Sequence, residues 1–356
     1  MPASLAPAAL GVAVPGPKDR TPTPAPPPDE PKKSAEAQRE DAARRFDQAA
    51  ANDAVVDPAL PFTPRGPAFN QTARLKEHQK AVEQKRAGEM PARAYQYKYL
   101  FVGGFSWDSL EDYFGPNIRR LQQLGLDAEF VKTDPLGRSE DNGKILAKKA
   151  RESDKRVVWI AHSKGGNDVI RGLMDDPRAQ QNTLAVVPIQ SPLFGTAAAE
   201  WAKLHPWLYA TAMVYSRLIN PRRLLSINPF FRYPTVEELS AGLGFTGRPP
   251  VRERIRFYPV VSRVSAETRV KILMWLSAGA VKTISGRDND GVVSPEDGVV
   301  PGHPFAFLEH VGHLDTVSNP SSWKYHVLGV RGHEPNYAAD LTEAIVRWIF
   351  DRRRAT

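Results

Sequence analysis

Short apolar runs alternate with amphipathic stretches from residue 95 onward. The runs are rich in β-branched and aromatic residues and are bounded by glycine or polar residues, a pattern typical of buried strands. Phe305–Leu308 is a late example of such a run. The four earlier runs are Tyr97–Val102, Ala128–Val131, Arg156–Ala161 and Leu184–Ile189.

The stretches between these runs carry apolar residues at helical spacing. Leu110–Leu124 is such a stretch, and Gly125 follows it as a helix stop. The same spacing predicts helices over Gly143–Arg151, from Ser163 to Leu173, and over Tyr337–Arg353. Strands that alternate with helices predict an α/β fold, with a mostly parallel, doubly wound sheet.

The first 90 residues have a different composition. Ten of the 32 prolines fall within residues 1–31, and proline is excluded from helix interiors and central strands. We therefore expect residues 1–90 to form a largely disordered arm and residues 91–356 to form the folded domain. Leu5–Val14 lacks preceding basic residues and is no clear signal peptide, so both a cytoplasmic and a secreted protein fit the sequence.

Composition excludes several classes of protein. The chain has no cysteine, which excludes disulfide scaffolds, thiolate metal sites and cysteine nucleophiles. No apolar stretch reaches about 18 residues, the length that a membrane-spanning helix needs. The net charge is +8, but no basic block is interleaved with aromatic residues, so we expect no nucleic-acid partner.

The strongest local motif is the sequence Ala-His-Ser-Lys-Gly around Ser163. Ser163, Ser240 and Ser277 each begin a Ser-x-Gly triplet, but only Ser163 lies between a predicted buried strand and a predicted helix. Such a strand–turn–helix exposes a serine hydroxyl above the sheet edge, with small residues where the strand and helix approach. The simpler interpretation is that Ser163 only caps the helix that follows.

A serine nucleophile needs a base and an orienting carboxylate, which in this fold class follow in the order Ser, acid, His. Two downstream segments can supply them. Gly-Arg-Asp-Asn-Asp-Gly-Val-Val spans residues 286–293, and Glu-His-Val-Gly-His-Leu-Asp-Thr-Val spans residues 309–317. Both are predicted loops at the carboxyl edge of the sheet, where sites of open α/β sheets lie.

At four segments the chain resembles the bacterial lipase and esterase branch of the α/β-hydrolase family. The resemblance covers about residues 95–350. Gly103 stands where the family usually has histidine, and Ala161 stands where it usually has glycine. The four segments are Leu100-Phe101-Val102-Gly103-Gly104-Phe105, Ala161 to Gly165, Ser191-Pro192-Leu193-Phe194-Gly195-Thr196, and Asn289-Asp290-Gly291-Val292-Val293 followed by Gly312-His313-Leu314-Asp315.

The resemblance implies an α/β-hydrolase fold and a catalytic triad of Ser163, Asp290 and His313. It also implies an oxyanion hole made by the backbone N–H groups of Phe105 and Lys164. Rivals for the acid are Asp288, Glu296 and Asp297, and rivals for the base are His310 and His162.

No cofactor or catalytic metal is expected. Asp315 matches a position that binds structural calcium in some of these lipases. We expect no calcium here, because such a site needs about six to eight oxygen ligands and no matching second aspartate precedes Asp315.

An insertion of about residues 196–279 is expected to form a helical cap or lid. Apolar helices there fit a lid that contacts a lipid surface, and an ordinary packed cap is the alternative. Two segments, Ile255–Val261 and Val281–Ser285, remain candidates for the strand that delivers the acid. The aromatic and aliphatic residues that suggest the lid are Trp201, Trp207, Leu208, Tyr209, Met213, Tyr215, Leu218, Leu224, Leu225, Ile227, Phe230, Phe231 and Tyr233.

The function implied is a serine carboxylic-ester hydrolase acting on a small-molecule or lipid ester. Polyester depolymerisation and acyl transfer use the same triad and remain alternatives. A binding protein that keeps the fold without turnover is a third reading, favoured by the atypical Gly103 and Ala161. The sequence leaves the oligomeric state open.

Overall fold

The computed structural model describes residues 69–105, 107–109, 112–205, 234–245, 249–264, 272–317 and 336–351. These residues form a parallel sheet in the order β1-β8-β7-β5-β4-β2-β3, with β6 paired to β5. Every described strand pair is parallel, so the strands end at one common edge. The strands are β1 (Phe69–Asn70), β2 (Tyr97–Val102), β3 (Asp127–Val131), β4 (Arg156–His162), β5 (Thr183–Ile189), β6 (Arg256–Phe257), β7 (Val260–Arg263) and β8 (Pro304–Glu309).

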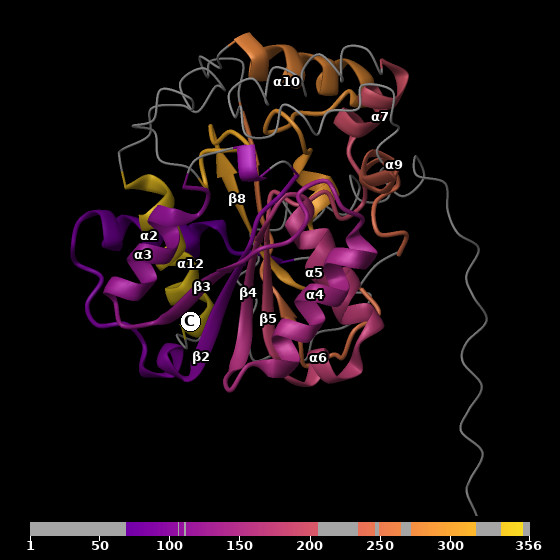
Figure 1. Cartoon of the computed structure of the whole chain (residues 1–356). Helices are drawn as coiled ribbons and strands as arrows, with labels where there is room; N and C mark the ends of the chain where they lie inside the picture. Colours follow the sequence, from indigo (N-terminus) through magenta and orange to yellow (C-terminus); the bar gives the residue numbers. More distant parts are fainter. Residues whose placement is uncertain are drawn as a thin grey trace, which may run out of the picture. The chain divides into compact units, whose positions relative to one another are not determined.

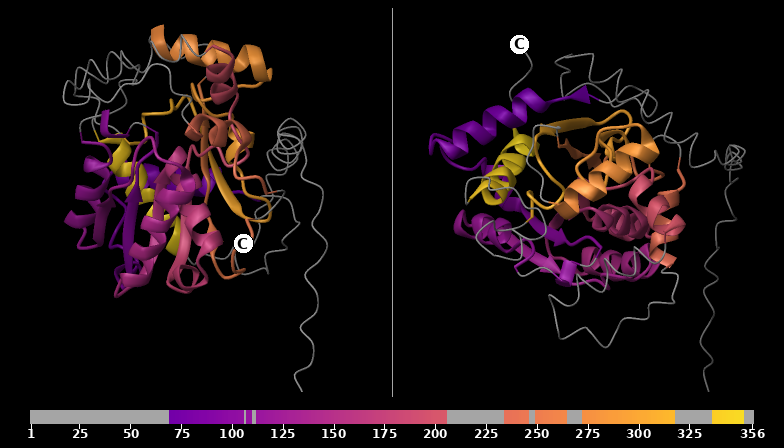
Figure 2. Two further views of the ribbon diagram at one scale, coloured as in Figure 1. Left: turned by 45° about the vertical axis from the view of Figure 1, so that its right-hand side comes forward. Right: turned by 90° about the horizontal axis from the view of Figure 1, so that it is seen from above.

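Helices cover both faces of the sheet, as the alternating pattern predicts (Figure 1). One face carries α4 (Ser139–Glu152), α5 (Lys164–Asp175) and α6 (Pro177–Gln181). The opposite face carries α2 (Thr72–Glu83), α3 (Gly115–Gln123) and α12 (Tyr337–Phe350). Further helices are α7 (Ala197–Leu204), α9 (Pro234–Ala241) and α10 (Ile272–Ser285); α7 and α10 lie beyond the carboxyl ends of the strands (Figures 1 and 2).

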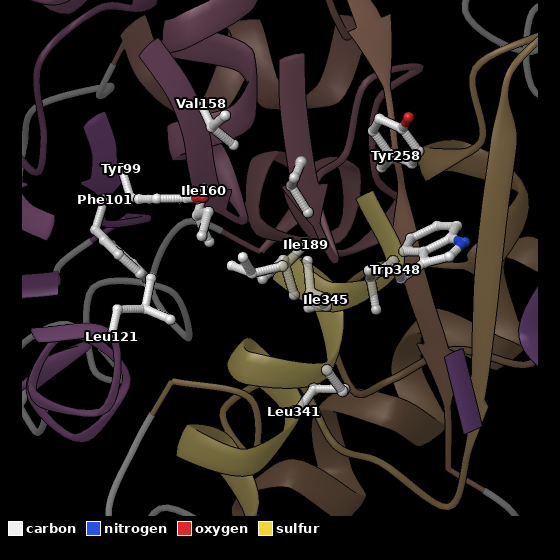
Figure 3. Packing of buried hydrophobic residues seen from close by; sticks show 14 of the residues in the cluster. Tyr99, Phe101, Leu121, Val158, Ile160, Ile189, Tyr258, Leu341, Ile345 and Trp348 are labelled. Atoms are coloured by element: carbon white, nitrogen blue, oxygen red, sulfur yellow. The ribbon is translucent and has the colours of Figure 1, made fainter. Parts of the chain in front are cut away.

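The core has two layers because side chains alternate along each strand. Tyr99 and Phe101 of β2 pack toward α2, α3 and α12, together with Ile345 of α12 (Figure 3). Leu100 and Val102 of the same strand pack toward α4 and α5. Burial on both faces explains why these strands appear in the sequence as apolar runs rather than as alternating patterns.

The helix expected over Leu110–Leu124 begins later, at Gly115. Phe114 has a left-handed backbone, with φ of 61°, and this conformation cannot continue a right-handed helix. Pro116 then lies in the first turn of α3, where its missing N–H costs no hydrogen bond. Residues 110 and 111 lie outside the described residues.

The folded part starts earlier than the expected boundary at residue 90. β1 pairs with β8, and α2 packs on α12 with Leu75 and Val82 buried. Residues 69–90 are therefore part of the fold and not of an arm, while residues 1–68 lie outside the described residues. The sequence pattern missed this because α2 is charged overall and buries only a narrow stripe.

The expected cap of residues 196–279 is divided by the sheet. The candidate strand Ile255–Val261 covers β6 and the start of β7, whereas the other candidate, Val281–Ser285, is the end of the helix α10. The insertion consists of one segment between β5 and β6 and a second segment between β7 and the loop of Asp290. Most of its aromatic residues, in 206–233, lie outside the described residues.

We expect Leu75→Ala to lower the free energy of unfolding by about 3 kcal/mol, because the side chain is fully buried in the layer shared with α12. Lys76→Ala on the exposed side of the same helix is the control, expected within about 0.5 kcal/mol of the unchanged protein. Denaturant unfolding of both variants measures this. Equal stability of the two variants would show that α2 contributes nothing to the core.

Candidate active site

Ser163 lies at a sharp turn between β4 and α5. Its backbone has φ of 53° and ψ of −130°, a conformation that non-glycine residues rarely adopt. The turn is compact because Gly165 lets α5 approach the end of β2. A Cβ at position 165 would lie 2.6 Å from the carbonyl oxygen of Gly103 and 2.7 Å from that of Val102. Both are backbone atoms, so only glycine fits.

A continuous chain of hydrogen bonds starts at the Ser163 hydroxyl. Its Oγ lies 2.9 Å from Nε2 of His313, and Nδ1 of His313 lies 2.9 Å from Oδ2 of Asp290. All three side chains are buried. Ser163 follows the carboxyl end of β4, whereas Asp290 and His313 lie in loops later in the sequence. The contact between Ser163 and His313 joins residues that are 150 positions apart.

The second carboxylate oxygen of Asp290 is held by its own loop. Oδ1 accepts hydrogen bonds from the backbone N–H groups of Val292, at 2.9 Å, and Val293, at 2.8 Å. The backbone carbonyl of Asp290 also accepts the N–H of His313 at 2.9 Å. The carboxylate therefore has a fixed orientation toward the imidazole.

The rival carboxylates have other positions. Asp288 is on the surface, where its Oδ1 lies 3.0 Å from Nζ of Lys282. Asp297 is buried beside Arg287, at 3.8 Å. Glu296 shares the short 3-10 turn Pro295–Gly298 with Asp297. Among the four, Asp290 is the one that the structure joins to His313.

The rival histidines are also separated by the structure. His310 is exposed and has a left-handed backbone, with φ of 62°. His162 is buried, and its ring centroid lies 4.6 Å from that of His313. Its partners include the Tyr113 hydroxyl, the Phe114 ring, the Gln190 side chain and the backbone of His313, which agrees with the expectation that it packs beside the turn.

The two expected oxyanion donors belong to segments that meet at Ser163. Lys164 is the first residue of α5, so its backbone N–H has no partner within the helix ladder. Phe105 follows Gly104, where a Cβ would lie 2.7 Å from Cβ of Ser163. The missing family histidine at Gly103 has a steric reason: a Cβ there would lie 2.6 Å from Cβ of Trp107.

The side chain of Lys164 turns away from the hydroxyl and is fully buried. Its Nζ lies 2.8 Å from both carboxylate oxygens of Asp168, one helical turn later. Asn142 of α4 donates to the same carboxylate at 2.8 Å. Although these partners favour the charged carboxylate, burial dominates and raises the pKa of Asp168. Through Asn142, the ion pair of Lys164 and Asp168 links the first turn of α5 to α4.

A second buried network surrounds His162. Nε2 of His162 lies 2.7 Å from the carbonyl oxygen of His313, so this nitrogen must be the donor. Nδ1 lies 2.5 Å from the Tyr113 hydroxyl, whose oxygen accepts the N–H of Gly104 at 3.3 Å. Burial, and then the neighbouring charge of His313, lower the pKa of His162 well below its ordinary value.

Two residues of this region were not among the candidates from the sequence, Tyr113 and Gln190. Gln190 directly follows β5, and its amide contacts the loop of His313. A polar residue at the carboxyl end of a buried strand is the signal that could have indicated Gln190. Tyr113 carries no such signal, because it stands in a mixed polar and apolar segment that follows no strand directly.

Within the described residues, no group of three or more His, Asp or Glu side chains is arranged to hold a metal ion. Asp315, the expected calcium counterpart, accepts a hydrogen bond from the backbone N–H of Gly312 at 2.8 Å. It thereby closes the turn that carries His313. In the same part of the chain, no helix is both long and apolar enough to cross a bilayer.

The buried neutral His162 makes stability depend on pH. Its folded pKa is depressed, so below about pH 6.5 the unfolded chain binds a proton that the folded chain excludes. Its contribution to stability is complete above that pH and falls by about 1.4 kcal/mol per unit below it. Urea unfolding at several pH values should therefore give a steeper acid loss for the unchanged protein than for His162→Gln. Parallel curves would contradict a neutral His162.

Comparison of the sequence with models of protein families and with curated proteins gives no match. Solved structures do match. A metagenomic carboxyl esterase, MGS0156, superposes with a TM-score of 0.61 and 19% identity, over 86% of this chain and 98% of the esterase. The mature lipase BlEst2 of Bacillus licheniformis gives 0.50 and 20% identity, over 64% of this chain and 88% of the lipase. The chain therefore has the α/β-hydrolase fold.

Proposed function

We propose that this chain hydrolyses carboxylic esters through a covalent acyl-enzyme, with Ser163 as the nucleophile, His313 as the general base and Asp290 as the orienting carboxylate. The observation that carries the proposal is the buried chain of hydrogen bonds from Ser163 through His313 to Asp290. This is the geometry in which a serine hydroxyl becomes nucleophilic at neutral pH.

In the first half-reaction, Oγ of Ser163 attacks the ester carbonyl carbon while Nε2 of His313 takes the hydroxyl proton. The tetrahedral intermediate then collapses. The bond from carbon to the alcohol oxygen breaks, and His313 returns the proton to the leaving alcohol. The acyl group remains bonded to Ser163 as an ester.

In the second half-reaction, water replaces the alcohol. His313 takes a proton from water as it attacks the acyl carbon, and the proton returns to Oγ of Ser163 when the acid leaves. Asp290 keeps Nδ1 of His313 protonated, so that Nε2 is the free base, and it stabilises the imidazolium that forms in both steps.

The backbone N–H groups of Phe105 and Lys164 are the proposed donors to the developing oxyanion. The amino end of α5 adds the positive end of its helix dipole at the same place. In well-studied cases one such donor contributes about 3 kcal/mol to stabilisation of the transition state.

The substrate class follows from the chemistry of the site and from the two structural relatives, a carboxyl esterase and a lipase. We propose a small-molecule or lipid ester. α7 and α10 lie over the carboxyl edge of the sheet, where a cap would lie (Figure 2). Contact of a lid with a lipid surface remains a prediction, as do the alternatives of polyester depolymerisation and acyl transfer.

We expect the unchanged protein to hydrolyse p-nitrophenyl esters of two to sixteen carbons and Ser163→Ala to lose at least about 10³-fold in kcat. The optimal acyl length separates an esterase from a lipase. Ser240→Ala is the matched control, because Ser240 begins another Ser-x-Gly triplet, in α9. It should keep the rate of the unchanged protein.

The opposite result is equally informative. If the unchanged protein is inert on every ester and a fluorophosphonate does not label it, the hydrolase proposal fails. The reading as a binding protein with this fold would then replace it.

A further inference from the structure

The backbone that carries His313 receives side-chain hydrogen bonds from two neighbouring strand ends. Nε2 of His162, the last residue of β4, lies 2.7 Å from the carbonyl oxygen of His313. Nε2 of Gln190, the residue after β5, lies 3.0 Å from the carbonyl oxygen of Gly312. Both side chains are 1% exposed.

We propose that His162 and Gln190 are positioning residues that hold the imidazole of His313 between Ser163 and Asp290. The inference rests on the proposed function and adds two residues to its machinery. Neither residue touches the reacting atoms. Each acts through the backbone of Gly312 or His313.

The His162 contact has a defined direction. A carbonyl oxygen only accepts, so Nε2 of His162 carries hydrogen, and the neutral ring then accepts the Tyr113 hydroxyl proton at Nδ1. Because the Tyr113 oxygen accepts from Gly104 N–H, one chain of bonds runs from the end of β2 to the base. The same network thus holds Gly104, which precedes the proposed oxyanion donor Phe105, and His313, the proposed base.

Both the nitrogen and the oxygen of the Gln190 amide are hydrogen-bonded within the site. Its nitrogen also donates to the Ser262 hydroxyl at 2.5 Å, and its oxygen accepts from the Thr316 hydroxyl at 2.9 Å. Gln190 has a left-handed backbone, with φ of 50°, at a position where a non-glycine residue costs of order 1 kcal/mol. Such strain is tolerated where surrounding contacts over-determine the conformation, and here they do.

Three buried contacts together fix the backbone at the base. The N–H of His313 donates to the carbonyl of Asp290, and the carbonyls of Gly312 and His313 accept from Gln190 and His162. The contacts arrive from three different segments. Loss of one lets the peptide tilt about the contacts that remain, and a displacement of about 1 Å at a catalytic group can lower a rate about 100-fold.

The test uses a matched pair of substitutions in the full chain. His162→Gln places an amide nitrogen near the position of Nε2, so the donor to His313 survives. His162→Asn reaches only the position of Nδ1, so that donor is lost. Both variants remove the ring and bury an amide, so general destabilisation affects them alike, and their difference reports the contact with His313.

Two assays are used. The first measures the rate of labelling by a fluorophosphonate, and the second measures kcat and KM on the preferred p-nitrophenyl ester. His162→Asn and Gln190→Met should lose about 10- to 100-fold in kcat and in labelling, with KM within about twofold. His162→Gln should stay within about threefold. The controls are His303→Asn and Gln180→Met, because His303 and Gln180 are buried at the opposite end of the sheet. Both should label like the unchanged protein.

The inference is overturned if His162→Asn and His162→Gln label at one rate, or if His303→Asn and Gln180→Met lose as much as the site variants. If the unchanged protein itself is not labelled, the proposed function fails, and a second readout decides the inference. We expect the Nδ1 proton of His313 that bonds Asp290 to give a low-field proton NMR line. Survival of that line in His162→Gln and its loss in His162→Asn supports the inference, whereas equal spectra overturn it.

Discussion

The approach of α5 to the end of β2 is the constraint on which the whole site depends. At Gly165 the helix backbone meets the carbonyls of Val102 and Gly103 with no room for a side chain. This contact forces the turn at Ser163 into its left-handed conformation and brings the amino end of α5 beside the segment that follows β2. The proposed nucleophile, a helix dipole and the two proposed backbone donors are thus gathered by one steric requirement. A larger residue at 165 would separate these groups while leaving each of them present.

The residues on either side of Ser163 anchor the turn to opposite faces of the sheet. His162 packs against Tyr113 and Phe114 on the face of α3. Its ring is neutral, because burial disfavours the charged form and lowers its pKa. Lys164 extends toward α4 and is paired with Asp168 on the other face. A buried ion pair adds little net stability, but removing one partner would leave an uncompensated charge. Both anchors therefore make displacement of the turn costly, and a preorganised turn loses less free energy in ordering when a substrate binds.

The sequence predicted the members of the hydrogen-bonded chain from local signals together with the family resemblance, which selected Asp290 and His313 among several carboxylates and histidines. Ser163 follows a buried strand and precedes a helix, while Asp290 and His313 stand in polar loops in the expected order. Gln190 carries a weak signal, as a polar residue after a buried strand, but the contacts of Gln190 and Tyr113 arise only when distant segments converge, so the sequence does not predict them. The start of the folded part was missed for a related reason. β1 has two residues, too few for a periodic pattern, and its pairing with β8, not its own composition, makes it a strand.

One helix of the expected cap region, α9, is tied to the core by hydrogen bonds at its start and near its end. Glu238 of α9 accepts from Nε of Arg138 and from the backbone N–H of Ser139, each at 2.9 Å. Thr235, in the first turn of α9, donates to the carbonyl of Leu136 at 2.5 Å. Both contacts are with the loop that leads into α4, which Asn142 in turn links to Asp168. Opening by rotation of α9 would break these bonds and expose the buried Thr235 hydroxyl. These bonds therefore hold α9 on the segment that leads into α4.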